Sequence, residues 1–211
     1  MKMEISDQLK SAIAELRKSE PRKFKQTVDL VVNLQKFEVK KTPLNIFIRI
    51  PHKSKDKKIA GFFESKSEII DSITEMDFKK YNDKKKLKSL VNKYDFFIAQ
   101  AKLMPKVATV FGRVLGPAGK MPSPQMGIVL NADQKSIDEL REKINTSLRI
   151  RTKEPSIKVA VGKEDMKDEE IIENVISIYN ELVKALPRDK ENIKNMEIKF
   201  TMTKPVKIKL R

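Results

Sequence analysis

The stretch LGPAGKMPSP, residues 115–124, brings glycines and a lysine together in one short segment, a combination that can cradle phosphate. A phosphate-binding P-loop requires the pattern G-x-x-x-x-G-K-[ST]. Counting five residues back from Gly119 reaches Val114, where the first glycine belongs. Met121 takes the place of the hydroxyl residue that would hold magnesium. We therefore expect a structural or RNA-backbone loop here, not a nucleotide site.

Other residue types that catalyse reactions are sparse. His52, the only histidine, lies in a polar, basic segment without an evident Ser, Cys or carboxylate partner, and we interpret it as solvated or facing RNA. The carboxylates of residues 163–170 precede a long helical pattern, where negative charge offsets the helix dipole. With no cysteine, disulfides and thiolate metal sites are excluded. We predict no catalytic residue, no metal and no cofactor; a nucleotide-dependent enzyme is the alternative.

Two basic segments have the composition of an RNA contact. In PRKFKQT, residues 21–27, Phe24 lies among basic residues just before a strand-like run. Such an aromatic either closes the edge of a core or stacks on RNA while its neighbours contact phosphates. In KFTMTKPVKIKLR, residues 199–211, lysines alternate with apolar residues as in an amphipathic edge strand, and the turn-like TMTKP offers hydroxyls to riboses. The lysines of residues 84–88 are interpreted as a solvated helix face.

The overall charge also favours an anionic partner. The 211 residues include 45 basic and 29 acidic ones, a net charge of +16 that repels itself in the compact state. Nucleic acid is the first candidate, because lysine and arginine release its condensed counterions, and an anionic membrane surface is the second. The sequence has no apolar run of 18 residues and no signal-peptide core at its start, so we expect a soluble, cytoplasmic protein.

The elements that would hold these segments follow two patterns. The chain ends show an α+β pattern, with helices at 6–18 and 168–186 and strands at 27–34, 45–50, 156–162, 196–202 and 206–210. After a polar linker at 51–58, the middle shows an apolar run at 59–63, helices at 66–73, 84–94, 103–111 and 133–145, and a strand at 95–100. Strands that alternate with helices indicate a parallel sheet covered on both faces.

These patterns predict two domains, one α+β and one α/β. The first 50 residues supply one helix and two strands, which is too little for a core of their own. We therefore predict that residues 1–54 and 148–211 form one split α+β domain, into which a three-layer α/β domain, residues 55–147, is inserted.

The segment 115–124 also resembles the L-G-P-R-G-x-M-P-x-P signature of the ribosomal large-subunit protein L-one family. Other stretches match that family in order, and the archaeal branch most closely: KFKQTVDLVVNL (23–34), RIP (49–51), YDFFIAQAKLMP (94–105), VAVGKEDMKDEEIIENV (159–175) and FTMTKPVKIK (200–209). The resemblance covers nearly the whole chain.

The resemblance implies a fold and a function. The fold would be a split α+β sandwich with an inserted Rossmann-like domain. The function would be that of a structural protein in the mobile side stalk of the large ribosomal subunit, which binds ribosomal RNA directly and assists the release of deacylated tRNA from the exit site. Such a protein also represses translation of its own operon by binding its mRNA. Its partners would be the ribosome and these RNAs, with no membrane, and it would be a monomer when free.

The resemblance also implies which residues bind RNA, through the family's K-F-x-x-T/S segment and T-M-G-P turn. The predicted RNA-binding residues are Arg22, Lys23, Phe24, Gln26, Thr27, Lys153, Lys163, Thr201, Met202 and Thr203. Two positions depart from the family pattern. Thr203 replaces a glycine, which would permit unusual backbone conformations or a close approach to RNA, so we expect a weaker or different contact there. Ala118 replaces an arginine, which favours a structural role for the loop.

Overall fold

The computed structural model describes residues 2–20, 22–65, 67, 69–81, 83–130 and 133–208, and it divides into two compact units. Unit 1 comprises residues 1–55 and 146–211, and unit 2 comprises residues 56–145. The domain boundaries drawn from the sequence, at 54/55 and 147/148, stay a prediction.

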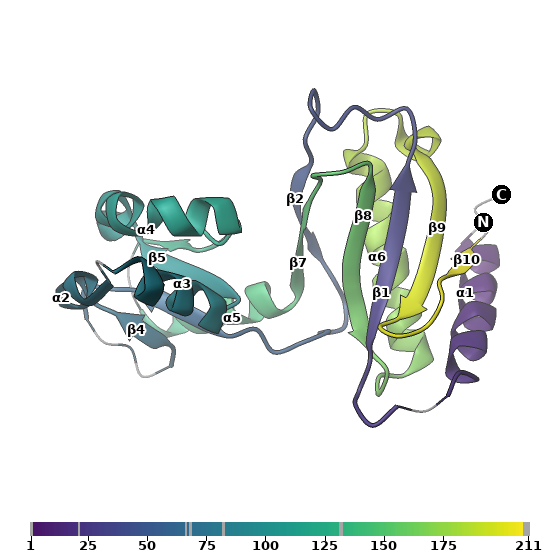
Figure 1. The fold of residues 1–211 in the computed structure, drawn as a ribbon, viewed down its shortest axis with the longest axis horizontal. Coiled ribbons are helices and arrows are strands. Elements are labelled where there is room, and N and C mark those ends of the chain that lie inside the picture. The colour runs from purple at the N-terminus through teal and green to yellow at the C-terminus, as the bar shows by residue number, and fades with distance from the viewer. Residues whose placement is uncertain are drawn as a thin grey trace. The chain divides into compact units, whose positions relative to one another are not determined.

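Unit 1 is an antiparallel sheet with two helices packed against it (Figure 1). Its helices and strands are α1 (Lys2–Arg17), β1 (Thr27–Leu34), β2 (Asn45–Arg49), β7 (Ser147–Arg151), β8 (Ser156–Lys163), α6 (Asp168–Ala185), β9 (Ile193–Phe200) and β10 (Val206–Ile208). Four strands follow the order β10-β9-β1-β8, while β2 and β7 form a separate two-stranded ribbon. The central strands therefore come from both ends of the chain, as the sequence pattern predicted.

The core of unit 1 lies on one face of this sheet. Along β1 buried and half-buried residues alternate, and the buried ones are Val28, Leu30, Val32 and Leu34. The stripe predicted on the long helix is buried against them: Ile171, Val175, Ile178, Leu182 and Leu186. Each such side chain contributes roughly 1.5–3 kcal/mol by leaving water, so this face fixes the register of the strands.

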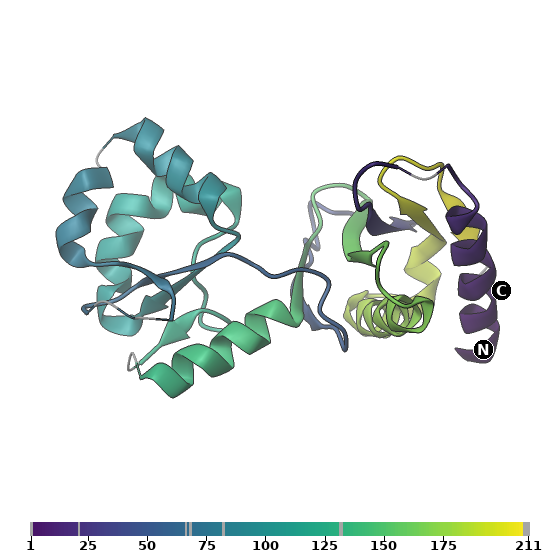
Figure 2. The same ribbon diagram turned by 90° about the horizontal axis from the view of Figure 1, so that it is seen from below.

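Unit 2 is a three-layer α/β structure. Its elements are β3 (Ile59–Phe62), β4 (Asp71–Ile73), α2 (Glu75–Phe78), α3 (Lys84–Lys93), β5 (Phe96–Gln100), α4 (Met104–Ala118), β6 (Ile128–Val129) and α5 (Gln134–Asn145). The strands are parallel in the order β4-β3-β5-β6, with helices on both faces (Figure 2). Along β5, Phe97 and Ala99 belong to one core cluster and Ile98 to the other. The predicted mixture of an α/β and an α+β part is confirmed.

The helix predicted at 66–73 is wrong. Residues 66 and 68 lie outside the described residues, Ile69 and Ile70 form a bend, and Asp71–Ile73 is strand β4, which pairs in parallel with β3. The cause is local: the Ser72 hydroxyl accepts a hydrogen bond from the Ser67 amide and donates to the Ile70 carbonyl. Serine side chains that bond the backbone in this way compete with a helix.

The segment 115–124 is only partly a loop, which corrects its description as one. Helix α4 continues through residues 115–118 and ends at Gly119, whose φ of 70° is the left-handed conformation that favours glycine. Val107, Phe111 and Leu115 form a buried stripe with a spacing of four, and this stripe outweighs the proline and glycines of the last turn.

Smaller differences concern short strands and element ends. Strands β7 and β6 and the one-turn helix α2 were not predicted. The strand predicted at 196–202 begins earlier and ends at Phe200, which leaves residues 201–203 as a turn. Of the strand predicted at 206–210, residues 209 and 210 lie outside the described residues. No helix in the described part of the chain is long and apolar enough to cross a bilayer.

Candidate RNA-binding site

The two segments predicted to bind RNA meet at one end of the sheet of unit 1. Thr27 begins β1 opposite Lys163, the last residue of β8. Its neighbour Val28 lies opposite Phe200, the last residue of β9. The start of β1 and the ends of β8 and β9 therefore lie together at the lower end of the sheet in Figure 1, where the turn 201–203 leaves β9. We call residues 22–27 and 201–203 the sheet-end site.

Hydrogen bonds tie the two segments of the sheet-end site together. The Thr201 hydroxyl accepts a hydrogen bond from the Thr27 amide at 3.0 Å and donates to the Thr27 carbonyl at 3.3 Å. The Met202 amide donates to the side-chain oxygen of Gln26 at 3.2 Å. Gln26 is only 1% exposed, so its amide group is an internal connector. The polar side chains Gln26 and Thr201 thus hold the backbone of both segments in one arrangement.

The turn itself accommodates threonine at position 203. Apart from glycine, only Lys36 and Asp189 have positive φ among the described residues, so Thr203 needs no glycine-like backbone. Its hydroxyl accepts a hydrogen bond from the Phe200 amide at 2.9 Å, and its own amide donates to the Phe200 carbonyl. The threonine therefore closes the turn that a glycine occupies in the family pattern.

Two large apolar side chains of the site are exposed to solvent. The exposed fraction is 52% for Phe24 and 60% for Met202. Of the two interpretations of Phe24, a ring that closes the core edge does not fit this exposure. Arg22 and Lys23 beside it are exposed as well. The site thus combines apolar surface with free cations, the combination on which bases stack while phosphates are neutralised.

Two carboxylates that were assigned to the helix dipole contact this site. The Gln26 amide donates to a carboxylate oxygen of Glu164 at 3.1 Å, and the Glu164 amide donates back to the Gln26 carbonyl. Asp165 pairs with the ammonium of Lys25 at 2.7 Å. This hydrogen bond raises the pKa of Lys25 and lowers that of Asp165. Only the acidic residues from Asp168 onward lie in the first turn of α6, so the earlier assignment is corrected for Glu164 and Asp165.

The remaining predicted residues and His52 have separate places. Lys163 is exposed at the end of β8, beside the sheet-end site. Lys153 follows β7 in the turn at the opposite end of the sheet and does not join the site.

The imidazole of His52 lies 2.7 Å from a carboxylate oxygen of Glu173, so the statement that it has no carboxylate partner is wrong. No pattern of residue spacing indicates this pair, which links residues 121 positions apart.

Lys120, the lysine of the segment 115–124, forms hydrogen bonds within unit 2. The Lys120 ammonium donates hydrogen bonds to the carbonyl oxygens of Val91 and Tyr94, at 2.7 and 2.8 Å. These carbonyls end helix α3, where the helix dipole attracts a cation. The lysine is therefore a helix cap, and it is not presented to a phosphate.

We expect Lys120→Met to lower the free energy of unfolding by about 1–2 kcal/mol, because two helix-end carbonyls lose a charged donor. RNA affinity should be unchanged. Chemical denaturation measures the first and RNA titration the second, with the exposed Lys88→Met on α3 as the matched control. Equal stability of the two variants would contradict the capping role.

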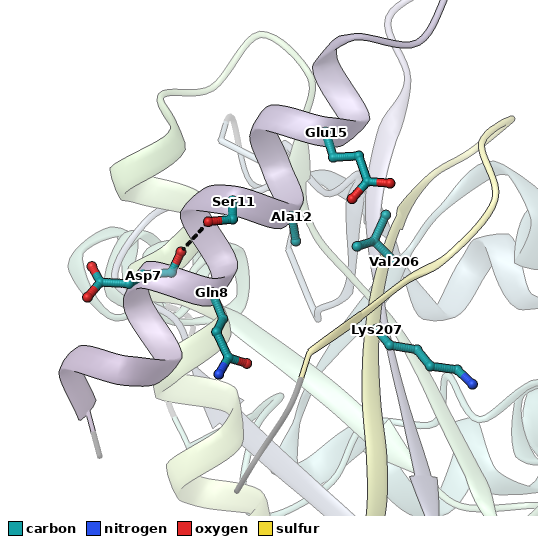
Figure 3. Close-up of a pocket in the computed structure, with 7 residues that line it drawn as sticks. All are labelled: Asp7, Gln8, Ser11, Ala12, Glu15, Val206 and Lys207. Carbon is teal, nitrogen blue, oxygen red and sulfur yellow. Dashed lines mark hydrogen bonds between the residues drawn. The ribbon is translucent and has the colours of Figure 1, made fainter.

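A hollow between α1 and β10 does not fit an anionic ligand. It has a volume of about 460 Å³ and is lined by Asp7, Gln8, Ser11, Ala12, Glu15, Val206 and Lys207 (Figure 3). The lining includes two carboxylates and one lysine, so its net charge does not attract a phosphate. Among the described residues no group of three or more acidic or histidine side chains is placed to hold a metal ion.

The structure is thus a split α+β unit with a three-layer α/β unit inserted in its sequence, and the segments that resemble the ribosomal L-one family meet in the split unit. The model of the ribosomal protein L1p/L10e family matches residues 16–204. The chain belongs to this family and is a non-enzymatic, RNA-binding ribosomal protein.

Similar proteins come from archaea. The large ribosomal subunit protein uL1 of Nanoarchaeum equitans is 34% identical, over 96% of this chain and 98% of its own length. The proteins of the same name from Pyrobaculum arsenaticum and Pyrococcus abyssi are 35% and 34% identical, over 96% and 91% of this chain and 94% and 90% of their own lengths. The predicted family resemblance is confirmed.

Proposed function

We propose that the chain is a structural component of the large ribosomal subunit and binds ribosomal RNA of the side stalk through the sheet-end site. The observation that carries this proposal is the junction of residues 26–27 with residues 201–202 by hydrogen bonds, which presents Phe24 and Met202 to solvent at one place. The relatives, which match over nearly their whole length, are large-subunit proteins by name.

The geometry supports recognition of a shaped RNA. The Gln26 and Thr201 side chains already form hydrogen bonds with backbone groups of the two segments. The segments therefore lose little conformational freedom when RNA binds. Exposed apolar side chains next to these groups would exclude water from the hydrogen bonds formed with riboses. The cations of Arg22 and Lys23 would contact phosphates, while Lys25 is already paired with Asp165. The Thr201 and Thr203 hydroxyls already donate to carbonyls of the protein, so recognition of RNA shape dominates at this site, and phosphate contacts orient the RNA.

Two finer functions belong to the same proposal. We propose that the chain binds its own mRNA where this message presents a shape like that of the stalk RNA, and so represses its translation. We further propose that, in the stalk, it accompanies deacylated tRNA out of the exit site. The preformed sheet-end site supports the first, since one rigid surface binds any RNA of the same shape. The +16 charge supports both, because each partner is a polyanion.

The test of the proposal is a titration of the full chain with large-subunit stalk RNA at several salt concentrations. We expect log affinity to fall linearly with log salt, with a slope that corresponds to roughly 4–8 phosphate contacts at about 0.7–0.9 per contact. The reason is that most of the 45 basic residues are lysines, which act as point charges. A hairpin of unrelated sequence and equal length is the control. Equal affinity for both RNAs, or no salt dependence, would contradict specific stalk binding.

A further inference from the structure

The ribbon of β2 and β7 has one apolar face and one polar face. Ile46, Ile48, Leu148 and Ile150 belong to the core of unit 1 or pack against it. Because side chains alternate along a strand, the intervening residues point the other way. These are Asn45, Phe47 and Arg49 on β2, and Ser147, Arg149 and Arg151 on β7, which pair with one another across the ribbon. We call this group the ribbon face.

The ribbon face concentrates arginine. It carries three of the nine arginines of the chain, and the segments 42–55 and 146–153, which include both strands, contain these three arginines, three lysines and no carboxylate. Lys153, which the sheet-end site does not include, directly follows this ribbon. A strip of this composition is electrostatically complementary to a polyanion and not to a basic or neutral surface.

The arginines of the ribbon face are held in defined positions. The guanidinium of Arg149 lies over the ring of Phe47, 5.4 Å from its centroid, and its Nε donates a hydrogen bond to the side-chain oxygen of Asn45 at 3.0 Å. Burial, and to a lesser extent the charge of Arg151, lower the pKa of Arg149. Arg149 and Arg151 lie two residues apart on the same side of β7, so their like charges repel each other and a bound anion would relieve that repulsion.

A hollow adjoins the other end of the ribbon face. It has a volume of about 300 Å³ and is lined by Arg49, Ile50, Pro51, Thr146 and Ser177. Arg49 is exposed, and its guanidinium is the group in this lining that suits phosphate oxygens. Ser177 is fixed by the hydrogen bond that its hydroxyl donates to the Arg49 carbonyl.

From these observations we infer that the ribbon face is a second RNA contact of unit 1, which binds the phosphate backbone of a strand beyond the one held at the sheet-end site. Arginine suits this role because its planar guanidinium binds two phosphate oxygens at once. The side-chain oxygen of Asn45 already accepts a hydrogen bond from Arg149, so we expect the face to orient RNA through phosphate contacts of its guanidinium groups. This inference rests on the proposed RNA-binding function.

The test compares the full chain with Arg49→Gln/Arg151→Gln, which removes two exposed charges without touching the Arg149–Phe47 contact. The matched control is Arg113→Gln/Arg141→Gln, two exposed arginines of unit 2. Stalk RNA affinity at low salt should fall roughly tenfold in the ribbon variant, and the salt slope should decrease by about 1.4–1.8, as two lost phosphate contacts require. The control should keep more than half of the wild-type affinity and slope.

A second variant, Arg149→Lys, keeps the charge and removes the planar group. It should weaken binding about threefold with an unchanged salt slope, since the phosphate is still neutralised but no longer held at two points. If the wild-type chain binds stalk RNA and the ribbon variant binds it equally well with the same slope, the ribbon face is not an RNA contact, and the proposed function stands. If that variant keeps RNA affinity but no longer enters large subunits, the face contacts protein and the inference is wrong. A wild-type chain that does not bind stalk RNA would overturn both.

Discussion

Replacing Met202 with aspartate should weaken binding of the full chain to stalk RNA by roughly 1–3 kcal/mol. The Met202 side chain is 60% exposed, so the fold should tolerate the change, and the backbone amide that donates to Gln26 is retained. What changes is the surface offered to RNA, because a thioether that excludes water becomes a carboxylate facing phosphates. Equilibrium titration measures the affinity, and thermal unfolding verifies that the protein is intact.

The matched control is Met76→Asp, on helix α2 of unit 2, where the methionine is 87% exposed. It adds the same charge to the same protein away from the sheet-end site. We expect it to change RNA affinity by less than half of the effect at Met202. Equal losses in the two variants would mean that net charge alone governs binding, and the assignment of Met202 would be wrong.

The second large effect is expected from Thr201→Val, which keeps the shape of the side chain and removes its hydroxyl. The Thr27 amide and carbonyl both lose their partner, so the turn is no longer fastened to the start of β1. We expect RNA affinity to fall by roughly 1–3 kcal/mol and the free energy of unfolding by about 1 kcal/mol. The larger effect on binding follows because the freed turn must be ordered again when RNA binds.

Thr109→Val provides the comparison for this hydroxyl. Its hydroxyl donates to the Pro105 carbonyl on the exposed side of α4, so the same atoms are exchanged away from the site. Stability can fall slightly in this control, but RNA affinity should not change. If Thr201→Val lowers stability without lowering affinity, the turn is a structural feature and does not position an RNA contact.

Helices and strands could be predicted from the sequence where a single periodic pattern of apolar residues dominated the segment. The stripe from Ile171 to Leu186 and the alternation of Val28, Leu30 and Val32 each indicate one buried face, and both are buried. At residues 66–73 the apolar spacing suited a helix, but serine side chains bonded the backbone and β3 offered a strand partner. Strand β7 was not predicted because its five residues form a strand by pairing with β2, which lies about a hundred residues earlier in the sequence.

The candidate site was less accessible to sequence reasoning. Phe24 and Thr201 were selected because their segments resemble a family motif and carry stacking and hydroxyl groups, and nothing in the spacing showed that they meet. Glu164 illustrates the limit: its carboxylate bonds the Gln26 amide across 138 positions, whereas its neighbours along the chain indicated a helix start. Long-range pairs of single polar groups leave no periodic trace, so only the fold shows them.

The pairing of β1 also sets an order of events during synthesis. Unit 2 is one continuous segment, residues 56–145, and has all its strands once that segment has left the ribosome. Strand β1 emerges first but must wait for β8 and then for β9, whose Phe200 lies opposite Val28. Because residues 201–203 form half of the sheet-end site, a nascent or truncated chain cannot assemble it. If RNA binds at this site as proposed, only a finished molecule could bind its message or enter a growing subunit, and binding would wait until translation of that chain is complete.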